Sequence, residues 1–250
     1  KLISKVDVCV NLIGILHEKG RVNTFKNIHS NFPKILADLC SAQKVKLVHI
    51  SALGLENAKD SRYAMSKISG EKLIRSAMPE ATIIKPSLVY SVDDNLTTKF
   101  MSLLSVLPIF PLYHGGKTKF TPIHVTELAE IIFYVISKEL YSKSIEAIGP
   151  EILSFKEILQ ILMRCIRKNT FLFPMPISLA RLTAFFMQIL PEPLITQDQI
   201  NLLKYDNIKT EKGTSNFDIG CPSKLKFEDT VMKYAFNWTE GGQFSNATKK

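Results

Sequence analysis

The chain has 250 residues and a net charge of +9 at pH 7. Its hydrophobic content of 46% and charged content of 22% exclude a disordered chain, because enough apolar surface is present to form a core. The positive charge favours an anionic partner, such as a phosphate-bearing cofactor, an acidic subunit or an anionic membrane surface, although a basic surface without a specific partner fits equally well. No basic run is interleaved with stacking aromatic residues in a recognised module, so no nucleic acid partner is expected.

Three apolar runs, at residues 6–12, 47–51 and 82–85, are typical of buried parallel strands. Residues 24–43 and 63–78 lie between them and carry the apolar spacing of helices. This alternation predicts an α/β fold, a Rossmann-like doubly wound sheet in which the three strands are adjacent and parallel. Ligands bind such sheets beyond the carboxyl ends of the strands, where Asn11, Ser51 and Pro86 fall.

Tyr63 and Lys67 are four residues apart, so on a helix they share one face and can act on one reacting group. An ammonium beside a phenol favours phenolate and lowers the tyrosine pKa from ~10 toward the working range. Ser51, at a strand end, could offer a hydroxyl to the same reacting oxygen. The three residues indicate proton transfer coupled to hydride chemistry, although a chance Tyr-x-x-x-Lys on an exposed helix turn is the alternative.

With these signals the chain resembles the extended and atypical short-chain dehydrogenase/reductases of the NAD-dependent epimerase/dehydratase superfamily. It is most similar to the alpha subcomplex subunit 9 family, the nucleotide-binding accessory subunit of respiratory complex I, and its bacterial relatives. The resemblance covers about residues 6–206. Its motifs are NLIG at 11–14, SRY at 61–63, Gly70-Glu71, MPEA at 78–81, IKPS at 84–87, FPMP at 173–176, PEP at 191–193 and TQD at 196–198.

The resemblance implies that Tyr63 is the catalytic acid/base, that Lys67 holds the cofactor ribose while lowering the tyrosine pKa, and that Ser51 is the third member. The remaining cofactor contacts that it implies are Asn11 and Gly14 against the adenosine side, and Pro86 with Ser87 near the nicotinamide. One departure is Ser91, which follows Tyr90 where the reductases often carry glycine.

A larger departure is that the eleven glycines form no glycine-rich dinucleotide fingerprint. A Rossmann half needs earlier strands, roughly 60–80 residues at about 30 per βαβ unit, so we expect that the chain is a fragment whose first strand lies at a sheet edge. A genuinely minimal sheet is the alternative. Binding of NADP or NAD should then be weakened. The residue that distinguishes the two cofactors would lie on one of the earlier strands.

The later part of the chain predicts helices at residues 96–107 and 126–138 and a strand at 144–149. Ser154 and Glu157 have the spacing of a capping box that opens another helix. A structural role is favoured over a catalytic role for His124. The expected organisation is a truncated NAD(P)-binding domain with pocket loops at 1–150, a smaller, mainly helical C-terminal lobe at 151–240 and a flexible tail at 241–250.

Residues 171–194 are unusually apolar but are interrupted by Pro174, Pro176 and Arg181, which excludes a transmembrane span. They form either the core of the lobe or an amphipathic helix, from Ser178 to Leu190, that lies on a membrane or a partner subunit. The four cysteines and five histidines lack the spacing of a disulfide framework or a metal site, so no metal is expected.

Two functions remain open. In the favoured one, the chain is an accessory, assembly or quinone-linked subunit of respiratory complex I whose NAD(P) is mainly structural, in the mitochondrial matrix or bacterial cytoplasm and peripheral on the inner membrane. In the alternative, it is an active NAD(P)-dependent reductase, epimerase or dehydratase that uses Tyr63 as acid/base.

Overall fold

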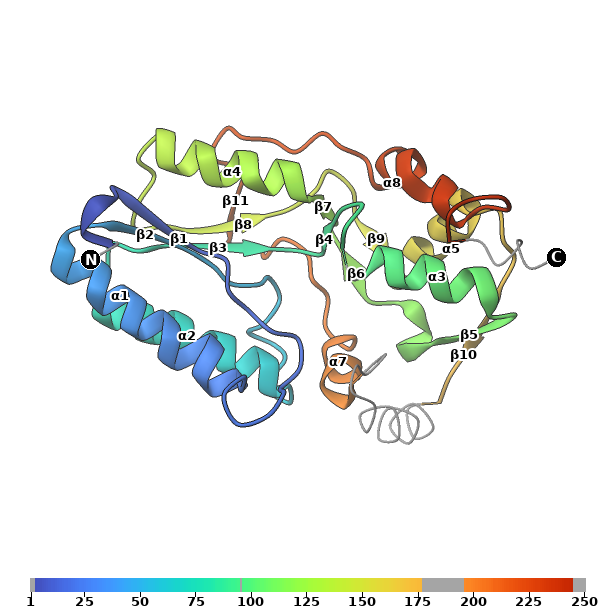
Figure 1. The fold of residues 1–250 in the computed structure, drawn as a ribbon, viewed down its shortest axis with the longest axis horizontal. Helices are drawn as coiled ribbons and strands as arrows, with labels where there is room; N and C mark the ends of the chain where they lie inside the picture. Colours follow the sequence, from blue (N-terminus) through green and yellow to red (C-terminus); the bar gives the residue numbers. More distant parts are fainter. Residues whose placement is uncertain (1–2, 95, 177–195, 245–250) are drawn as a thin grey trace.

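The computed structural model describes residues 3–94, 96–176 and 196–244 (Figure 1). A five-stranded sheet runs through the first part of the molecule, and every neighbouring pair of its strands is parallel. This confirms the predicted α/β class and the adjacency of the first three strands, with β1 at one edge of the described sheet. The strand order is β1 (Val8–Asn11), β2 (Lys46–Ile50), β3 (Thr82–Pro86), β8 (Ser144–Ala147) and β11 (Thr214–Ser215).

Helices cover both faces of this sheet, as Figure 1 shows. Helices α1 (Phe32–Gln43) and α2 (Arg62–Ala77) pack on one face, where Leu47 of β2 joins their core. Helix α4 (Val125–Ser137) packs on the other face, where Val48 and Ile50 join its core. Because side chains alternate along a strand, His49 and Ser51 lie on the α1/α2 side with Leu47.

The predicted helix at 24–43 is divided into a π-helical turn, η2 (Lys26–Asn31), and α1. Gly70 of α2 lies against this turn so closely that a Cβ at Gly70 would come within 3.0 Å of the His29 carbonyl oxygen. The π-helical turn therefore brings the backbone of His29 directly onto α2.

A second core lies beyond the sheet and combines segments from both sides of residue 150. Helix α5 (Phe155–Cys165) begins at Ser154, and the predicted capping box with Glu157 is present. Helix α8 was not predicted, although Phe227, Val231 and Tyr234 have helical spacing and are buried. The other elements of this core are α3 (Thr97–Val106), β5 (Ile109–Leu112), β10 (Phe171–Pro174), α8 (Phe227–Ala235) and η4 (Phe236–Trp238). The proposed boundary at residue 150 stays a prediction.

The remaining short elements are η1 (Ile3–Lys5), β4 (Val89–Tyr90), η3 (Tyr113–Gly116), β6 (Lys119–Phe120), β7 (Ile123–His124), β9 (Leu153–Ser154) and α7 (Gln197–Leu202). Ile3 of η1 packs against the core of α1 and α2. No described helix combines the length and hydropathy that a membrane span requires. The predicted helix from Ser178 to Leu190, the PEP motif and the last residues of the tail lie outside the described residues.

Candidate cofactor site

The site residues proposed from the sequence lie at one edge of the sheet and on the adjacent helix. Asn11 ends β1, Ser51 directly follows β2, and Pro86 ends β3. Tyr63 and Lys67 lie one turn apart near the start of α2. Because the carboxyl ends of parallel strands meet at the same edge, the three strand ends are neighbours at the place where doubly wound folds bind ligands.

Helix α2 begins at a polar turn that a distant segment caps. The Ser61 hydroxyl accepts a hydrogen bond from the Ala64 amide at 3.1 Å. The Asp198 carboxylate on α7 accepts a hydrogen bond from the Ser61 hydroxyl at 2.8 Å. It also accepts hydrogen bonds from the amides of Arg62 at 2.7 Å and Tyr63 at 3.1 Å. A carboxylate is favoured at a helix N-terminus by the unpaired amides there, so Asp198 ties α7 to the turn that carries Tyr63.

The Tyr63 ring packs edge-on against Phe25 and His29, with centroid distances of 5.9 Å and 5.2 Å. Burial, followed by the negative charge of Asp198, raises the pKa of Tyr63 to about 12. The predicted lowering of the Tyr63 pKa by Lys67 is not found in this structure, where burial and Asp198 both raise that pKa. Among the described residues, no hydrogen bond involves the Tyr63 hydroxyl. The phenol is protonated at neutral pH.

Lys67 is a buried cation whose side chain is 5% exposed. Its ammonium donates one hydrogen bond, to the Ile50 carbonyl at 3.4 Å, and forms no salt bridge within the described chain. Burial lowers the pKa of Lys67 to about 8, although the negative charge of Glu71 raises it in part. A Cβ at Gly14 would lie 3.2 Å from Lys67 Nζ, so the turn after β1 runs directly past the ammonium.

Two neutral histidines lie beside Lys67. The Ile15 amide donates to His29 Nε2 at 3.0 Å, so the proton of His29 is on Nδ1, 2.9 Å from the Ser66 hydroxyl. Burial, then the charge of Lys67, lowers the pKa of His29 to about 4 and that of His49 to about 3.

The proton of His49 is placed by its neighbour on β1. The Ile13 amide donates to Asn11 Oδ1 at 3.1 Å, so Asn11 Nδ2 is the donor to His49 Nδ1 at 2.9 Å. His49 therefore carries its proton on Nε2, a buried atom that has no partner among the described residues.

Ser51 is turned toward an ion-pair cluster. Its hydroxyl donates to Glu71 Oε1, while Glu71 Oε2 accepts from Lys85 at 3.0 Å. Lys85 also pairs with Glu56 at 2.6 Å. Because the hydroxyl proton of Ser51 is held by Glu71, only its lone pairs remain for a ligand. Among the described residues no hydrogen bond joins Ser51 to the Tyr63–Lys67 pair.

The Ser87 hydroxyl is held within the protein. It donates to the Asn207 carbonyl at 2.8 Å and accepts from the Thr121 amide at 3.1 Å. Residues 196–207 thus cross from the start of α2 to the end of β3. His124 caps α4 by accepting a hydrogen bond from the Thr126 amide at 3.4 Å, in agreement with its expected structural role.

The donors at Lys67 fit the ribose of a nicotinamide nucleotide. Lys67 Nζ has one long hydrogen bond in the described chain, and the hydroxyl oxygens of a ribose are suitable acceptors for its remaining donors. No glycine-rich turn opens a helix in the described residues, so a partner for the pyrophosphate is not identified. The fit of the described residues to the cofactor is thus limited to the donors that Lys67 offers a ribose.

Sequence reasoning assigned no role to four residues that shape this site: His29, His49, Glu71 and Asp198. Glu71 and Asp198 stand in the motifs that carry the family resemblance, so their place in the chain was visible but their contacts were not. The two histidines gave no signal, because their partners are brought together only by the fold.

A scan of protein-family models found no match to the chain. The chain is 27% identical to NADH dehydrogenase [ubiquinone] 1 alpha subcomplex subunit 9 of Arabidopsis thaliana over 255 residues, which cover 96% of this chain and 63% of the relative. The protein of the same name from Mus musculus is 22% identical over 95% of this chain and 65% of its own length. The chain thus spans less than two thirds of the length of these curated relatives.

Solved structures with the same fold include dTDP-glucose 4,6-dehydratase from Bacillus anthracis in complex with NAD. It has a TM-score of 0.65 and 16% identity, and the match covers 94% of this chain and 72% of that one. The dTDP-4-dehydrorhamnose reductase from Clostridium acetobutylicum has a TM-score of 0.64 and 16% identity over 92% of this chain and 80% of its own. The resemblance drawn from the motifs is therefore confirmed: the chain is similar in sequence to alpha subcomplex subunit 9 of complex I and shares the Rossmann-like fold of NAD-dependent dehydratases and reductases.

Proposed function

We propose that this chain is an accessory or assembly subunit of respiratory complex I that holds NAD or NADP mainly for structural reasons. The two relatives reported above match 95% or more of this chain and are named as subunits of mitochondrial NADH dehydrogenase, which is complex I. Partners would be other subunits of that complex, in the mitochondrial matrix or at the inner membrane.

The observation that carries the proposal is the contrast between Lys67 and Tyr63. Lys67 keeps a buried ammonium with unused donors, which suits a bound ribose. Tyr63 has a pKa of about 12, and the Ser51 proton is held by Glu71, so neither is prepared for proton transfer at neutral pH. The binding group is thus retained without an activated acid/base. A bound nicotinamide would supply hydride chemistry, but the residues around it are suited to binding the nucleotide rather than to proton transfer.

An active reductase, epimerase or dehydratase is the second candidate. A ceramide reductase from Caulobacter vibrioides is 24% identical over 129 residues, which cover 52% of this chain. Tyr63 and Lys67 are both present, and general acid/base catalysis by a tyrosine contributes ~10²–10⁴ in rate where it operates.

Turnover by the purified protein of natural length separates the two candidates. The proposal predicts that NADH or NADPH binds and that Tyr63→Phe changes neither binding nor oxidation of the nucleotide. Reproducible NAD(P)H oxidation that falls ~10²–10⁴-fold in Tyr63→Phe would establish the enzyme instead.

Binding by these 250 residues alone should be weak, because no glycine-rich turn is present for the pyrophosphate. Charge-assisted hydrogen bonds contribute roughly 1.5–3 kcal/mol each, so their loss costs several decades in affinity. Calorimetry with NADH and with NADPH on the 250-residue chain measures this affinity. Micromolar binding would disprove the weakening.

A further inference from the structure

An exposed apolar surface lies on the two-stranded ribbon of the second core. Strands β5 and β10 are parallel, and Ile109 is in register with Phe171. Phe110 and Leu112 of β5 are buried in the core, so the alternate residues of the ribbon face outward. Ile109 is 57% exposed and Phe171 is 63% exposed. We call the outward residues the ribbon patch: Val106, Leu107, Ile109, Phe171 and Phe173.

The residues of the ribbon patch are held next to one another. The Phe171 amide donates to the Pro108 carbonyl at 2.9 Å, and the Thr170 hydroxyl donates to the carbonyls of Leu104 and Leu107 at 3.0 Å each. Single exposed apolar side chains are common on protein surfaces, but a contiguous group of this kind marks an interaction site. Figure 1 places the ribbon at the end of the molecule away from α1 and β1.

The two stretches of the chain that carry the ribbon strands contain cationic but no acidic residues. No aspartate or glutamate occurs between Asp94 and Glu127, or between Glu157 and Glu192, and the ribbon strands lie in these two stretches. The described residues of these stretches include six cationic side chains: Lys99, Lys117, Lys119, Arg164, Arg167 and Lys168.

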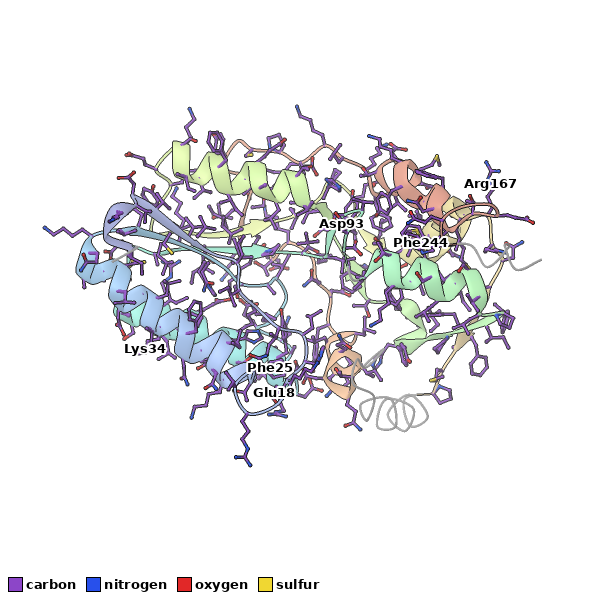
Figure 2. All side chains as sticks on the ribbon, viewed as in Figure 1. Glu18, Phe25, Lys34, Asp93, Arg167 and Phe244 are labelled. Atoms are coloured by element: carbon purple, nitrogen blue, oxygen red, sulfur yellow. The ribbon has the colours of Figure 1, made fainter. Side chains whose placement is uncertain are left out.

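Cations also line a hollow close to the start of β10. An open hollow of about 490 Å³ at the end of α5 is lined by Gln160, Met163, Arg164, Arg167, Lys168 and Asn169. Arg164 is paired with Glu228 at 2.8 Å, whereas Arg167 and Lys168 form no salt bridge within the described residues. Figure 2 shows Arg167 at the same end of the molecule as the ribbon. Guanidinium, ammonium and amide groups are the donors that phosphate oxygens require.

We propose that this end of the molecule docks on an anionic lipid bilayer. The ribbon patch enters the interfacial region, and Arg167 and Lys168 contact the headgroup phosphates. Large apolar side chains beside Arg167 and Lys168, which have no ion-pair partner in the described chain, fit an anionic lipid surface, because apolar burial and attraction to phosphate then act together. The proposal is independent of the Tyr63 site and would hold for an accessory subunit and for a reductase alike.

Co-sedimentation of the purified chain with phosphatidylcholine vesicles, with and without phosphatidylglycerol, tests the proposal. The chain should bind the anionic vesicles, and binding should weaken as salt is raised. Phe171→Asp removes a large apolar side chain from the bilayer and should weaken binding about tenfold or more. Phe133→Asp is the matched control, because Phe133 is 72% exposed on α4, away from the ribbon.

A second variant tests the charge with little effect on apolar burial. Arg167→Gln combined with Lys168→Gln should weaken binding to anionic vesicles about thirtyfold and leave any binding to neutral vesicles unchanged. Circular dichroism would serve as the control that each variant is folded. The proposal is overturned if folded wild type does not sediment with anionic vesicles, if neutral vesicles bind equally well, or if Phe171→Asp and Phe133→Asp behave alike.

Discussion

Replacing Lys67 by methionine should stabilise the fold and abolish its ligand affinity together. Lys67 is buried and has no salt-bridge partner within the described residues, so its charge destabilises the folded state. We explain the presence of this charge by its use in binding a ligand. Methionine keeps a long apolar side chain and removes the charge. The variant therefore separates the stability of the fold from the use of the site.

The size of the effect follows from the pKa of Lys67, which burial lowers from 10.5 to about 8. The folded state binds this proton less tightly than the unfolded state, so stability is lower below pH 8 and rises as pH increases from about 8 to 10.5. This difference between the pKa values of the unfolded and folded states lowers the free energy of unfolding at neutral pH by about 3 kcal/mol. Loss of the long hydrogen bond to Ile50 offsets about 1 kcal/mol, so Lys67→Met should gain about 2 kcal/mol at pH 7.

Chemical denaturation at a series of pH values measures this prediction, and calorimetry with NADH or NADPH measures the loss of affinity in the natural-length protein. Lys72→Met is the control, because Lys72 is an exposed residue of the same helix and its replacement should change stability by less than about 0.5 kcal/mol. The reasoning is refuted if Lys67→Met is less stable than wild type at pH 7, or if the difference between them is the same at pH 7 and pH 10.

Three further predictions concern the framework of the site. Asp198→Asn removes a negative charge at the start of α2, so it should destabilise the protein by about 1–3 kcal/mol in thermal unfolding. It should also lower the pKa of Tyr63 in a titration of phenol absorbance, and an unchanged pKa would contradict this. Gly70→Ala should cost roughly 1–3 kcal/mol or more in denaturant unfolding, because its Cβ meets the His29 carbonyl, and full stability would show that the contact relaxes easily. Ser154→Ala should cost about 1 kcal/mol through loss of the capping box, and a neutral result would mean that water replaces the cap.

Local sequence patterns were enough to predict the parallel sheet and several helices. The apolar runs placed β1, β2 and β3, and the spacing of Ser154 and Glu157 predicted the start of α5 correctly. These features depend on neighbouring residues in the chain, which periodicity and capping chemistry describe directly. Helix α8 was not predicted, because its apolar spacing lies within a polar region of the sequence.

The chemistry of the candidate site could be predicted only in part. The Tyr63–Lys67 spacing on one helix was correct, but the direction of the Tyr63 pKa shift was not. That shift depends on burial and on Asp198, which is 135 residues away in the chain. The Ser51 hydroxyl is likewise held by Glu71, 20 residues away on a helix. Side-chain partners brought together by the fold decide the protonation states, and local spacing does not contain them.

The most direct test of the proposed function is the rescue of complex I assembly in cells that lack this protein. Variants of the natural-length protein would be compared by native gel electrophoresis and by NADH-dependent quinone reduction. If the nucleotide is structural, Tyr63→Phe should restore assembly as wild type does, because in the described chain its hydroxyl forms no hydrogen bond, whereas Lys67→Met should fail to restore it. Equal failure of Tyr63→Phe and Lys67→Met, or full rescue by Lys67→Met, would contradict the account.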